Sequence, residues 1–172
     1  MDKKLGVIVP FRNRYDQIVP FIETMKEYLD KKEIPFEIIF VKQDDAKLFN
    51  RGMLLNIGFK QAQKLECDYI VFHDIDMLPI DVDYSYSDHP LHLATNFQDN
   101  ERELFETYFG GVTLFPINDF RRINGYSNKY WGWGYEDDDL LLRCVKKNVE
   151  LDTLKLKNVG PHGTALRFNG QS

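Results

Sequence analysis

Two carboxylates, Asp74 and Asp76, follow a short apolar run near the middle of the sequence. If that run is a strand, side chains two residues apart point to the same side, so both carboxylates would aim together. Like charges this close repel each other unless a cation lies between them. A divalent metal ion with phosphate oxygens as further ligands would fill that place. The same residues are also typical of a turn, because Asp often ends a strand and Pro79 follows. The pattern leaves a metal site and a turn equally open, and it predicts that His73, out of phase with the pair, is packed.

The segment WGWGYEDDD, from Trp131 to Asp139, contains both tryptophans of the chain. Each tryptophan is followed by a glycine, which lets a loop adopt backbone angles that other residues avoid. An indole between two glycines is poorly placed for a core, whereas its flat face suits the C–H face of a sugar ring. The alternative is a packing contact at the entry to the next helix. We favour the interpretation that Trp133 covers a ligand.

Four consecutive acids, Glu136 to Asp139, open the helix that follows. A helix N-terminus favours negative charge, but capping explains one or two acids and not four. Helical phase separates them, and Asp139 lines up with Arg143, which predicts a solvated ion pair. Asp137 and Asp138 align instead with the apolar side of the helix, formed by Leu141, Leu142, Cys144 and Val145. We therefore expect Asp137 and Asp138 to face the protein or its cleft.

Asp137 is a candidate general base, because a carboxylate whose pKa lies near the working pH can take a proton from a substrate hydroxyl. The helix dipole lowers the pKa of such a residue, whereas burial and neighbouring acids raise it. The sequence does not decide between these two directions.

The apolar pattern predicts the elements that would position these groups. The first half reads as strand, helix, strand, helix and strand, over Leu5–Phe11, Tyr15–Leu29, Phe36–Val41, Arg51–Leu65 and Tyr69–Phe72. The later elements are two short strands (Leu91–Thr95, Gly111–Phe115), a short helix around Phe120 and Ile123 that stops at Gly125, a helix over Glu136–Lys147 and an edge strand over Glu150–Leu156. This order predicts an α/β domain with a parallel sheet covered by helices on both faces. Such sheets bind ligands at the carboxyl ends of their strands, where this sequence has the polar clusters Arg12–Arg14, Gln43–Asp45 and Asp74–Asp76.

Composition limits the class of protein. A chain of 172 residues with 43% hydrophobic side chains fits one folded domain. Its net charge of -5 does not provide the positive field that captures nucleic-acid phosphates, so nucleic acid is not an expected partner. No apolar run approaches the ~20 residues that a membrane helix needs, so no transmembrane anchor is expected. The two cysteines, Cys67 and Cys144, are isolated and indicate a reducing compartment, which predicts a cytoplasmic location.

Five motifs together resemble those of a known family. They are VPFRNR (9–14), FNRGMLLNIGF (49–59), FHDIDMLP (72–79), YFGGV (108–112) and INGYSNKYWGWGYEDDD (123–139). In order and approximate spacing this series is similar to that of the β-1,4-galactosyltransferases, glycosyltransferase family 7. The resemblance implies a GT-A (Rossmann-like) fold, with a mixed, mostly parallel sheet in a single catalytic domain (1–172). Residues 1–80 would form a nucleotide-binding half, and residues 81–172 a half for the donor sugar and the acceptor.

The activity that the resemblance implies is an inverting transfer of galactose from UDP-galactose to a saccharide hydroxyl. The implied cofactor is Mn²⁺, with Mg²⁺ as the alternative, and an acceptor ending in N-acetylglucosamine is one expectation. Because this sequence lacks the stem and membrane anchor of animal relatives, the resemblance points to a compact member of bacterial or viral type.

The family's motifs assign a role to each candidate residue. Asp137 would be the catalytic base, and Asp76 and His162 would be metal ligands. The donor would be held by Arg12, Arg14, Phe49, Arg51, Asp74, Tyr108, Gly111, Trp133 and Glu136. The acceptor would be bound by Asp138, Tyr135, Arg167 and Phe168. In the family, a tyrosine before FGG goes with galactose and a smaller residue admits N-acetylgalactosamine, so Tyr108 favours galactose.

The sequence departs from the family pattern at two positions. Val159 stands where the family's later metal motif has methionine, so water or a backbone carbonyl would replace that ligand. Tyr135 replaces a glycine, which would narrow the acceptor site or stiffen the loop. His162 is also consistent with an ordinary loop histidine beside a Gly-Pro pair.

Three other interpretations stay open. The chain could be a catalytically silent domain that binds a UDP-sugar or a saccharide, or a transferase of another UDP-sugar such as UDP-N-acetylgalactosamine. A metal-dependent phosphoester hydrolase ranks last, because the sequence lacks the further carboxylate or histidine clusters of a two-metal site.

Overall fold

A computed structural model describes residues 2–94, 96–97, 109–151 and 166–169 of the chain. Its central feature is a five-stranded sheet with the order β2-β1-β3-β7-β5. The strands are β1 (Leu5–Phe11), β2 (Phe36–Lys42), β3 (Tyr69–His73), β5 (Leu91–His92) and β7 (Val112–Pro116). β1 pairs in parallel with both β2 and β3, whereas β7 is antiparallel to its neighbours β3 and β5. The sheet is therefore mixed, and β7 is its one reversed strand.

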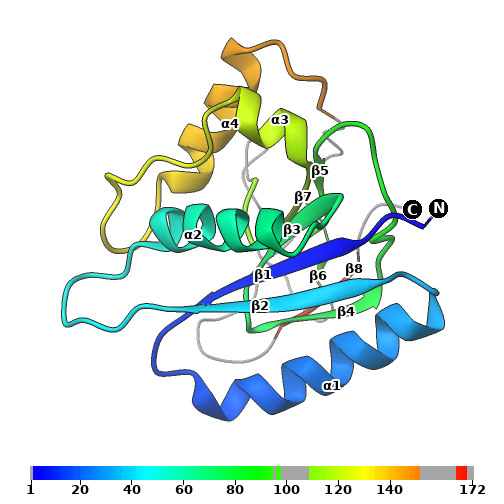
Figure 1. Cartoon of the computed structure of the whole chain (residues 1–172). Helices are drawn as coiled ribbons and strands as arrows, with labels where there is room; N and C mark the ends of the chain where they lie inside the picture. The colour runs from blue at the N-terminus through cyan, green and yellow to red at the C-terminus, as the bar shows by residue number, and fades with distance from the viewer. Residues whose placement is uncertain (1, 95, 98–108, 152–165, 170–172) are drawn as a thin grey trace.

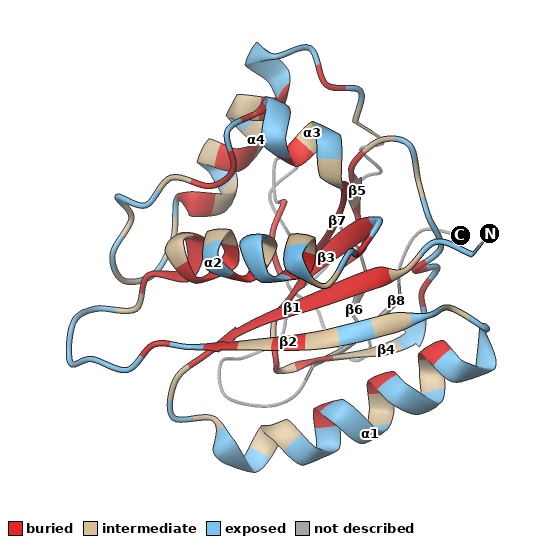
Figure 2. Ribbon diagram, in the orientation of Figure 1, coloured by how far each residue is buried: buried red, intermediate tan, exposed pale blue. Residues whose placement is uncertain are grey.

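Helices cover both faces of this sheet. They are α1 (Tyr15–Lys31), α2 (Arg51–Lys64), α3 (Ile117–Arg122) and α4 (Glu136–Lys146). α1 lies against one face, and α2, α3 and α4 lie on the other (Figure 1). In β1, Val7 and Val9 join the cluster that α1 packs against, whereas Ile8 joins the cluster on the other side. Because both of its faces are buried (Figure 2), this strand needs the near-continuous apolar run from which it was predicted.

A smaller three-stranded sheet, with the order β4-β8-β6, was not predicted. Its strands are β4 (Met77–Asp81), β6 (Asn96–Phe97) and β8 (Leu166–Asn169). Pro79 favours a turn in the sequence, but β4 is an edge strand of this sheet, where a residue without an N–H donor is tolerated. β4 begins directly after Asp76, so this sheet holds one end of the Asp74–Asp76 segment.

The predicted elements of the first half are confirmed to within two residues, because each is a long run with clear period. The stop at Gly125 is also confirmed. Its φ is +64°, and its N–H donates to the carbonyl of Phe120 at 3.1 Å. The strand predicted over Glu150–Leu156 is wrong for residues 150 and 151, which belong to no strand, and residues 152–156 lie outside the described residues.

Both cysteines, Cys67 and Cys144, are buried free thiols. Burial raises the pKa of Cys144 to about 12, which keeps that thiol protonated and unreactive. Among the helices that the structure describes, none combines the length and the apolar character needed to cross a membrane.

Replacing Gly58 by alanine is expected to destabilise the fold. Gly58 lies in α2 against β1, and a Cβ there would collide with Cγ2 of Ile8 and lie 3.1 Å from Cγ2 of Val41. Overpacking a core typically costs about 1–3 kcal/mol, whereas alanine gains about 1 kcal/mol of helix propensity over glycine. Because the collision is with the branched and fully buried Ile8, we take the upper part of that range, about 2–3 kcal/mol, and expect a net loss of about 1–2 kcal/mol in the free energy of unfolding, measured by urea denaturation. Gln61→Ala, at an exposed position of α2, is the control and should stay close to wild type. An unchanged urea midpoint in Gly58→Ala would contradict the close packing.

Candidate active site

The segment Asp74–Asp76 is a turn between β3 and β4. β3 ends at His73, and the N–H of Met77 donates back to the carbonyl of Asp74 at 3.2 Å. The strand conformation predicted for these residues is therefore wrong, and the turn is confirmed. The predicted proximity of the two side chains is also confirmed, because the turn brings the two carboxylates close enough for the charge of Asp74 to act on Asp76.

Asp76 is a carboxylate in surroundings that disfavour its charge. Burial raises the pKa of Asp76 to about 6, and the charge of Asp74 adds to this rise. The guanidinium groups of Arg14 and Arg51 oppose it without cancelling it. A carboxylate in this state binds a further cation favourably, because the cation restores the interaction that water no longer provides.

Two buried histidines support this region, as packed side chains. The prediction for His73 is confirmed: its Nε2 lies 2.8 Å from the hydroxyl of Tyr84 and its Nδ1 lies 2.9 Å from the carbonyl of Asp74. His92 was missed by the sequence analysis. Its Nε2 donates to the carbonyl of Gly110 at 2.7 Å, one residue before Gly111, whose carbonyl accepts the N–H of Asp74 at 2.9 Å. Burial lowers the pKa of each histidine to about 4, so both are neutral near pH 7.

The four acids that open α4 differ in exposure. Glu136 is buried, Asp137 is partly buried and Asp138 is exposed. The expected inward direction is therefore confirmed for Asp137. Asp138 is not packed inside the protein, so its place toward the cleft stays a prediction, and Glu136 takes the innermost place instead. The predicted ion pair is confirmed, with Arg143 Nε 2.7 Å from Asp139 Oδ2. Val145, predicted on the apolar side, is also exposed, because α4 packs through Leu140 and Cys144.

Arg51 joins the two acidic segments. Its Nε donates to Oδ1 of Asp74 at 2.8 Å, and its Nη1 donates to Oδ1 of Asp137 at 2.9 Å. Glu136 lies further away, with Oε1 3.8 Å from the same Nη1. This bridge was not predicted, since the partners lie 23 and 86 residues from Arg51 along the chain. Only the fold brings the start of α2 to the start of α4.

The direction of the pKa of Asp137, which the sequence left open, is upward. Burial raises the pKa of Asp137 to about 7, Arg51 opposes the rise, and Glu136 and Asp74 add to it. A carboxylate with a pKa near neutrality is ionised in a large fraction of molecules at physiological pH and is still basic enough to accept a proton. The geometry and the electrostatics therefore both suit a general base.

The glycine-flanked tryptophans form a loop beside the segment that precedes α2. Gly132 and Gly134 have φ angles of +90° and +99°, and the side chain of Trp133 is 88% exposed. The N–H of Gly132 donates to the carbonyl of Phe49 at 2.7 Å, which ties this loop to that segment. The prediction that Trp133 is not a core residue is confirmed, and its exposed ring lies in a loop whose backbone angles require glycine.

Arg12 and Arg14 lie at the carboxyl end of β1 and differ in their contacts. Arg12 donates through Nη1 to the carbonyls of Asp45 and Lys47, at 3.0 and 2.6 Å, and its guanidinium lies 5.8 Å from the ring centroid of Phe49. Arg14 acts on Asp76 through its charge. Arg12 therefore orders the loop before α2, and Arg14 lies near enough to the proposed metal ligand for its charge to oppose the rise in the pKa of Asp76.

Tyr135 is the N-cap residue of α4 and has a φ of +73°, in the left-handed region. This conformation costs a residue with a Cβ ~1–2 kcal/mol. Glycine avoids that cost, but it lowers stability by about 0.4–1 kcal/mol because it gives the unfolded chain more conformational freedom. Because its side chain is 72% exposed, Tyr135→Gly removes little packing. We expect the free energy of unfolding to rise by about 0.5–1 kcal/mol in urea denaturation. Tyr135→Ala removes the ring but keeps the Cβ, so it should show no gain; equal gains in both variants would contradict the argument from backbone angle.

Several predicted site residues cannot be placed. Tyr108, Val159 and His162 lie outside the described residues. Arg167 and Phe168 lie in β8, where their backbone pairs with Leu78 and Pro79 of β4, and the structure describes no side chains there. Their predicted roles stay predictions.

The described part of the site offers an incomplete ligand set for a metal ion. Within the described residues, no group of three His, Cys, Asp or Glu side chains is arranged to hold one. The available donors are carboxylate oxygens, which suit Mn²⁺ and Mg²⁺. The acids around Arg51 and Arg14 also outnumber these two cations, since Asp74, Asp76, Glu136 and Asp137 all lie there. The chemistry of the site therefore fits a divalent cation that Asp76 binds together with ligands from elsewhere.

Two family profiles match the chain. One, described as the N-terminal region of glycosyl transferase group 7, matches residues 1–88, and one described as the N-terminal domain of galactosyltransferase matches residues 91–162. A mixed sheet with helices on both of its faces places the chain in the α/β class. The chain belongs to the glycosyltransferase group 7 family, as the motifs predicted.

Relatives and solved structures agree with this assignment. A xylosylprotein 4-beta-galactosyltransferase of Caenorhabditis elegans is 36% identical over 152 residues, covering 86% of this chain and 52% of the relative. The beta-1,4-galactosyltransferase 4 of Mus musculus is 37% identical over 163 residues, covering 92% and 46%. The chain thus spans about half the length of the curated relatives that it matches.

Two structures of Drosophila beta-1,4-galactosyltransferase 7 superimpose on the chain with a TM-score of 0.81. The catalytic domain in complex with xylobiose is 33% identical, with 87% of this chain and 63% of that one covered. A mutant in complex with manganese, UDP-Gal and xylobiose is 31% identical, with coverage of 90% and 67%. The predicted GT-A fold is confirmed by this similarity.

Proposed function

We propose that this chain is an inverting, metal-dependent glycosyltransferase that moves galactose from UDP-galactose to a saccharide hydroxyl. The observation that carries the proposal is the meeting of two acidic segments at the carboxyl edge of the sheet, where Arg51 contacts both Asp74 and Asp137. The relatives named as galactosyltransferases, and the Drosophila structure with manganese and UDP-Gal, support the donor and the cofactor.

In this reaction Asp137 is the general base. Its carboxylate takes the proton of the acceptor hydroxyl as that oxygen attacks the anomeric carbon of galactose. The bond from that carbon to the UDP oxygen breaks, and UDP leaves with the electron pair. One displacement inverts the anomeric carbon, so no protein nucleophile is required.

Asp76, with His162 as a further ligand, would hold the Mn²⁺ ion. When bound, the ion offsets the negative charge that develops on the leaving diphosphate. The charges of Arg14 and Asp74 bear on Asp76, so they set how strongly its carboxylate attracts a cation. Mg²⁺ is the alternative ion.

The donor and acceptor sites follow from the motifs. Arg12, Arg14 and Phe49 would hold the nucleotide, with Tyr108 selecting galactose. Trp133 would cover the donor, and Asp138, Tyr135, Arg167 and Phe168 would bind the acceptor. The Drosophila structures contain xylobiose, which supports xylosides as acceptors to test beside N-acetylglucosamine. A cytoplasmic location stays a prediction, supported by the free thiols Cys67 and Cys144.

The test is an incubation with Mn²⁺ and UDP-galactose, with and without N-acetylglucosamine or a β-xyloside, in which UDP release and product mass are followed. Acceptor-dependent UDP release together with a product heavier by one hexose supports the proposal. UDP binding without turnover on either acceptor favours the silent binding domain. Equal turnover of UDP-N-acetylgalactosamine would overturn the choice of donor, and phosphate release from unrelated esters would favour the hydrolase.

A further inference from the structure

Arg51 is held in place before any substrate arrives. It is the first residue of α2, directly after the N-cap Asn50, whose side chain accepts the N–H of Met53 at 3.0 Å. Asn50 also donates through Nδ2 to the carbonyl of Asn128 at 2.8 Å, and its N–H donates to Oε1 of Gln43 at 2.8 Å. Three hydrogen bonds of Asn50 therefore fix the start of α2, so the backbone from which the Arg51 side chain extends is held in place.

The hydrogen bonds that the guanidinium of Arg51 donates go to acidic side chains. Nε donates to Asp74 and Nη1 donates to Asp137, and the arginine is buried. Among the described residues, Nη2 of Arg51 and the hydroxyl of Tyr126 are both buried without a hydrogen bond of good geometry, and they lie close enough for Arg51 to oppose the rise that burial produces in the pKa of Tyr126. Because the fork is planar and rigid, Arg51 cannot turn toward a diphosphate without breaking both contacts. This is at odds with the role in holding phosphates that the motif resemblance implies.

The base faces more acids than cations. The charged and titratable groups around Asp137 are Arg51 on α2, Asp74 after β3, Glu136 and Asp138 on α4, and Tyr126 on the segment before α4. Arg51 is the cation among these, and it is the group that lowers the pKa of Asp137. Without it, burial and the neighbouring carboxylates would act on Asp137 unopposed.

We propose that Arg51 is the positioning residue of the general base: through its two hydrogen bonds it fixes the Asp137 carboxylate relative to the donor-side residue Asp74. The inference rests on the proposed function, because it requires Asp137 to be the base. It deepens that function by making base and donor site one unit, joined through a single side chain. A donor that contacts Asp74 would therefore affect the position of the Asp137 carboxylate through Arg51.

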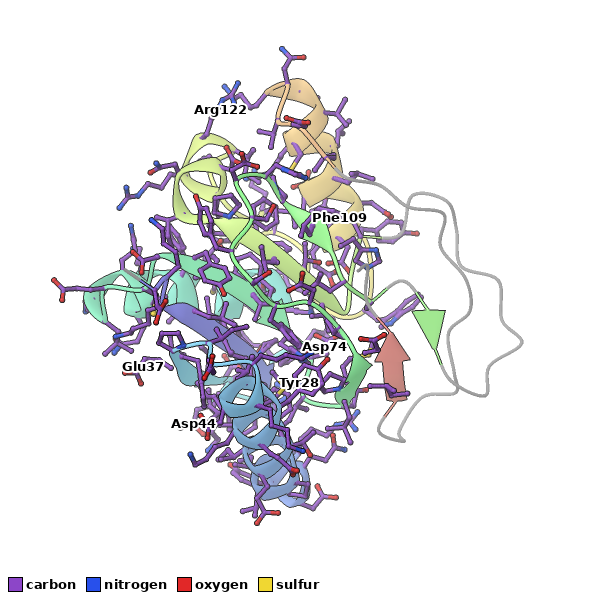
Figure 3. The ribbon with its side chains drawn as sticks, turned by 90° about the vertical axis from the view of Figure 1, so that its right-hand side faces the viewer. Tyr28, Glu37, Asp44, Asp74, Phe109 and Arg122 are labelled. Atoms are coloured by element: carbon purple, nitrogen blue, oxygen red, sulfur yellow. The ribbon has the colours of Figure 1, made fainter. Side chains whose placement is uncertain are left out.

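Two substitutions separate charge from shape. Arg51→Gln removes the charge, and Arg51→Lys keeps the charge but replaces the fork by a single nitrogen that cannot span both acids. The matched controls are Arg122→Gln and Arg122→Lys, since Arg122 lies on α3 at the periphery, away from Asp74 (Figure 3). Each variant is tested for kcat, KM for UDP-galactose, the pH profile of kcat, and UDP affinity by calorimetry with Mn²⁺.

We expect both Arg51 variants to lower kcat by about 10–100-fold, the range seen when the partner that orients a functional group is lost. UDP affinity should stay within about threefold of wild type. In Arg51→Gln the midpoint of the pH profile should move up by about one unit, because an opposite charge beside Asp holds its pKa down by that amount or more. In Arg51→Lys the midpoint should move less. A tenfold loss of UDP affinity together with an unchanged midpoint of the pH profile would overturn the inference. It would indicate that Arg51 binds the phosphates of the donor instead.

A second measurement, an NMR titration, does not depend on catalytic activity in any of the variants. The carboxyl carbon of Asp137 is titrated by NMR in protein labelled at aspartate, with the signal assigned by its loss in Asp137→Asn. An upward shift in Arg51→Gln, absent in Arg122→Gln, supports the bridge even if UDP-galactose proves not to be the donor. An unmoved titration in a folded Arg51→Gln protein overturns it, whatever the activity of wild type.

Discussion

Asp137→Asn is expected to lower kcat by about 10²–10⁴-fold, the contribution typical of a general base. Asparagine keeps the shape of the side chain and removes the proton acceptor, so UDP binding should remain. Initial rates and calorimetry with UDP measure the two effects separately. Asp139→Asn, which removes the same charge from the same helix but breaks the partly buried pair with Arg143 and no contact to Arg51, is the matched control and should keep its activity. Activity retained in Asp137→Asn would assign the proton transfer to another group.

The activity of wild type should depend on pH through the same residue. Because burial raises the pKa of Asp137 to about 7, the fraction ionised falls tenfold per unit below that value, and kcat should fall with it. Above pH 7 the rate should reach a plateau. A profile that is flat from pH 5 to 8 would contradict the assignment of Asp137 as the titrating base.

Stability should show the opposite trend. The pKa of Asp137 is raised above its unfolded value of about 3.9, so its protonated form is favoured on folding and its contribution is complete at low pH. That contribution is lost as pH rises through about 7. The difference in Tm between wild type and Asp137→Asn should therefore favour wild type more at pH 5 than at pH 8, measured without ligand.

Asp76→Asn is expected to lower kcat by about 10²–10³-fold, the cost of losing one group that stabilises developing charge. The asparagine oxygen is a weaker ligand, so half-maximal activity should also need more Mn²⁺. Titrating Mn²⁺ at saturating UDP-galactose separates these two effects. Asp81→Asn, on the exposed end of β4, is the control for a lost carboxylate nearby and should titrate like wild type. An unchanged Mn²⁺ midpoint in Asp76→Asn would show that another residue binds the ion.

The sequence predicts the framework of this site better than its contacts. Apolar runs such as Leu5–Phe11 predict strands because both sheet faces must be filled, and that demand is local. The burial of Glu136 could not be predicted, since helical phase says which residues share a side and not which neighbour covers that side. The bridge through Arg51 also depends on the packing of α2 beside α4, which no local pattern encodes.

The Asp74–Asp76 turn shows how a correct site can follow from an incorrect conformation. Strand phase and the turn both bring the two carboxylates together, so the pattern indicates their proximity under either interpretation. In the same stretch β4 could not be predicted because it contains Pro79, and a proline is compatible with a strand only at the edge of a sheet. Edge position depends on β8, which comes almost ninety residues later in the chain.

The antiparallel pairing of β7 with β3 has a consequence for how this chain can be divided. β3 from the first half is flanked by β1 on one side and by β7 from the second half on the other. A fragment that ends near residue 88 would leave Tyr69–His73 as an open edge, with unpaired N–H and C=O groups along a strand that is buried throughout in the whole chain. Such an edge recruits other strands, so the isolated fragment would self-associate. We therefore expect the two matched family segments to fold as one cooperative unit, and exchange between relatives by recombination at their boundary would have to preserve this strand pair.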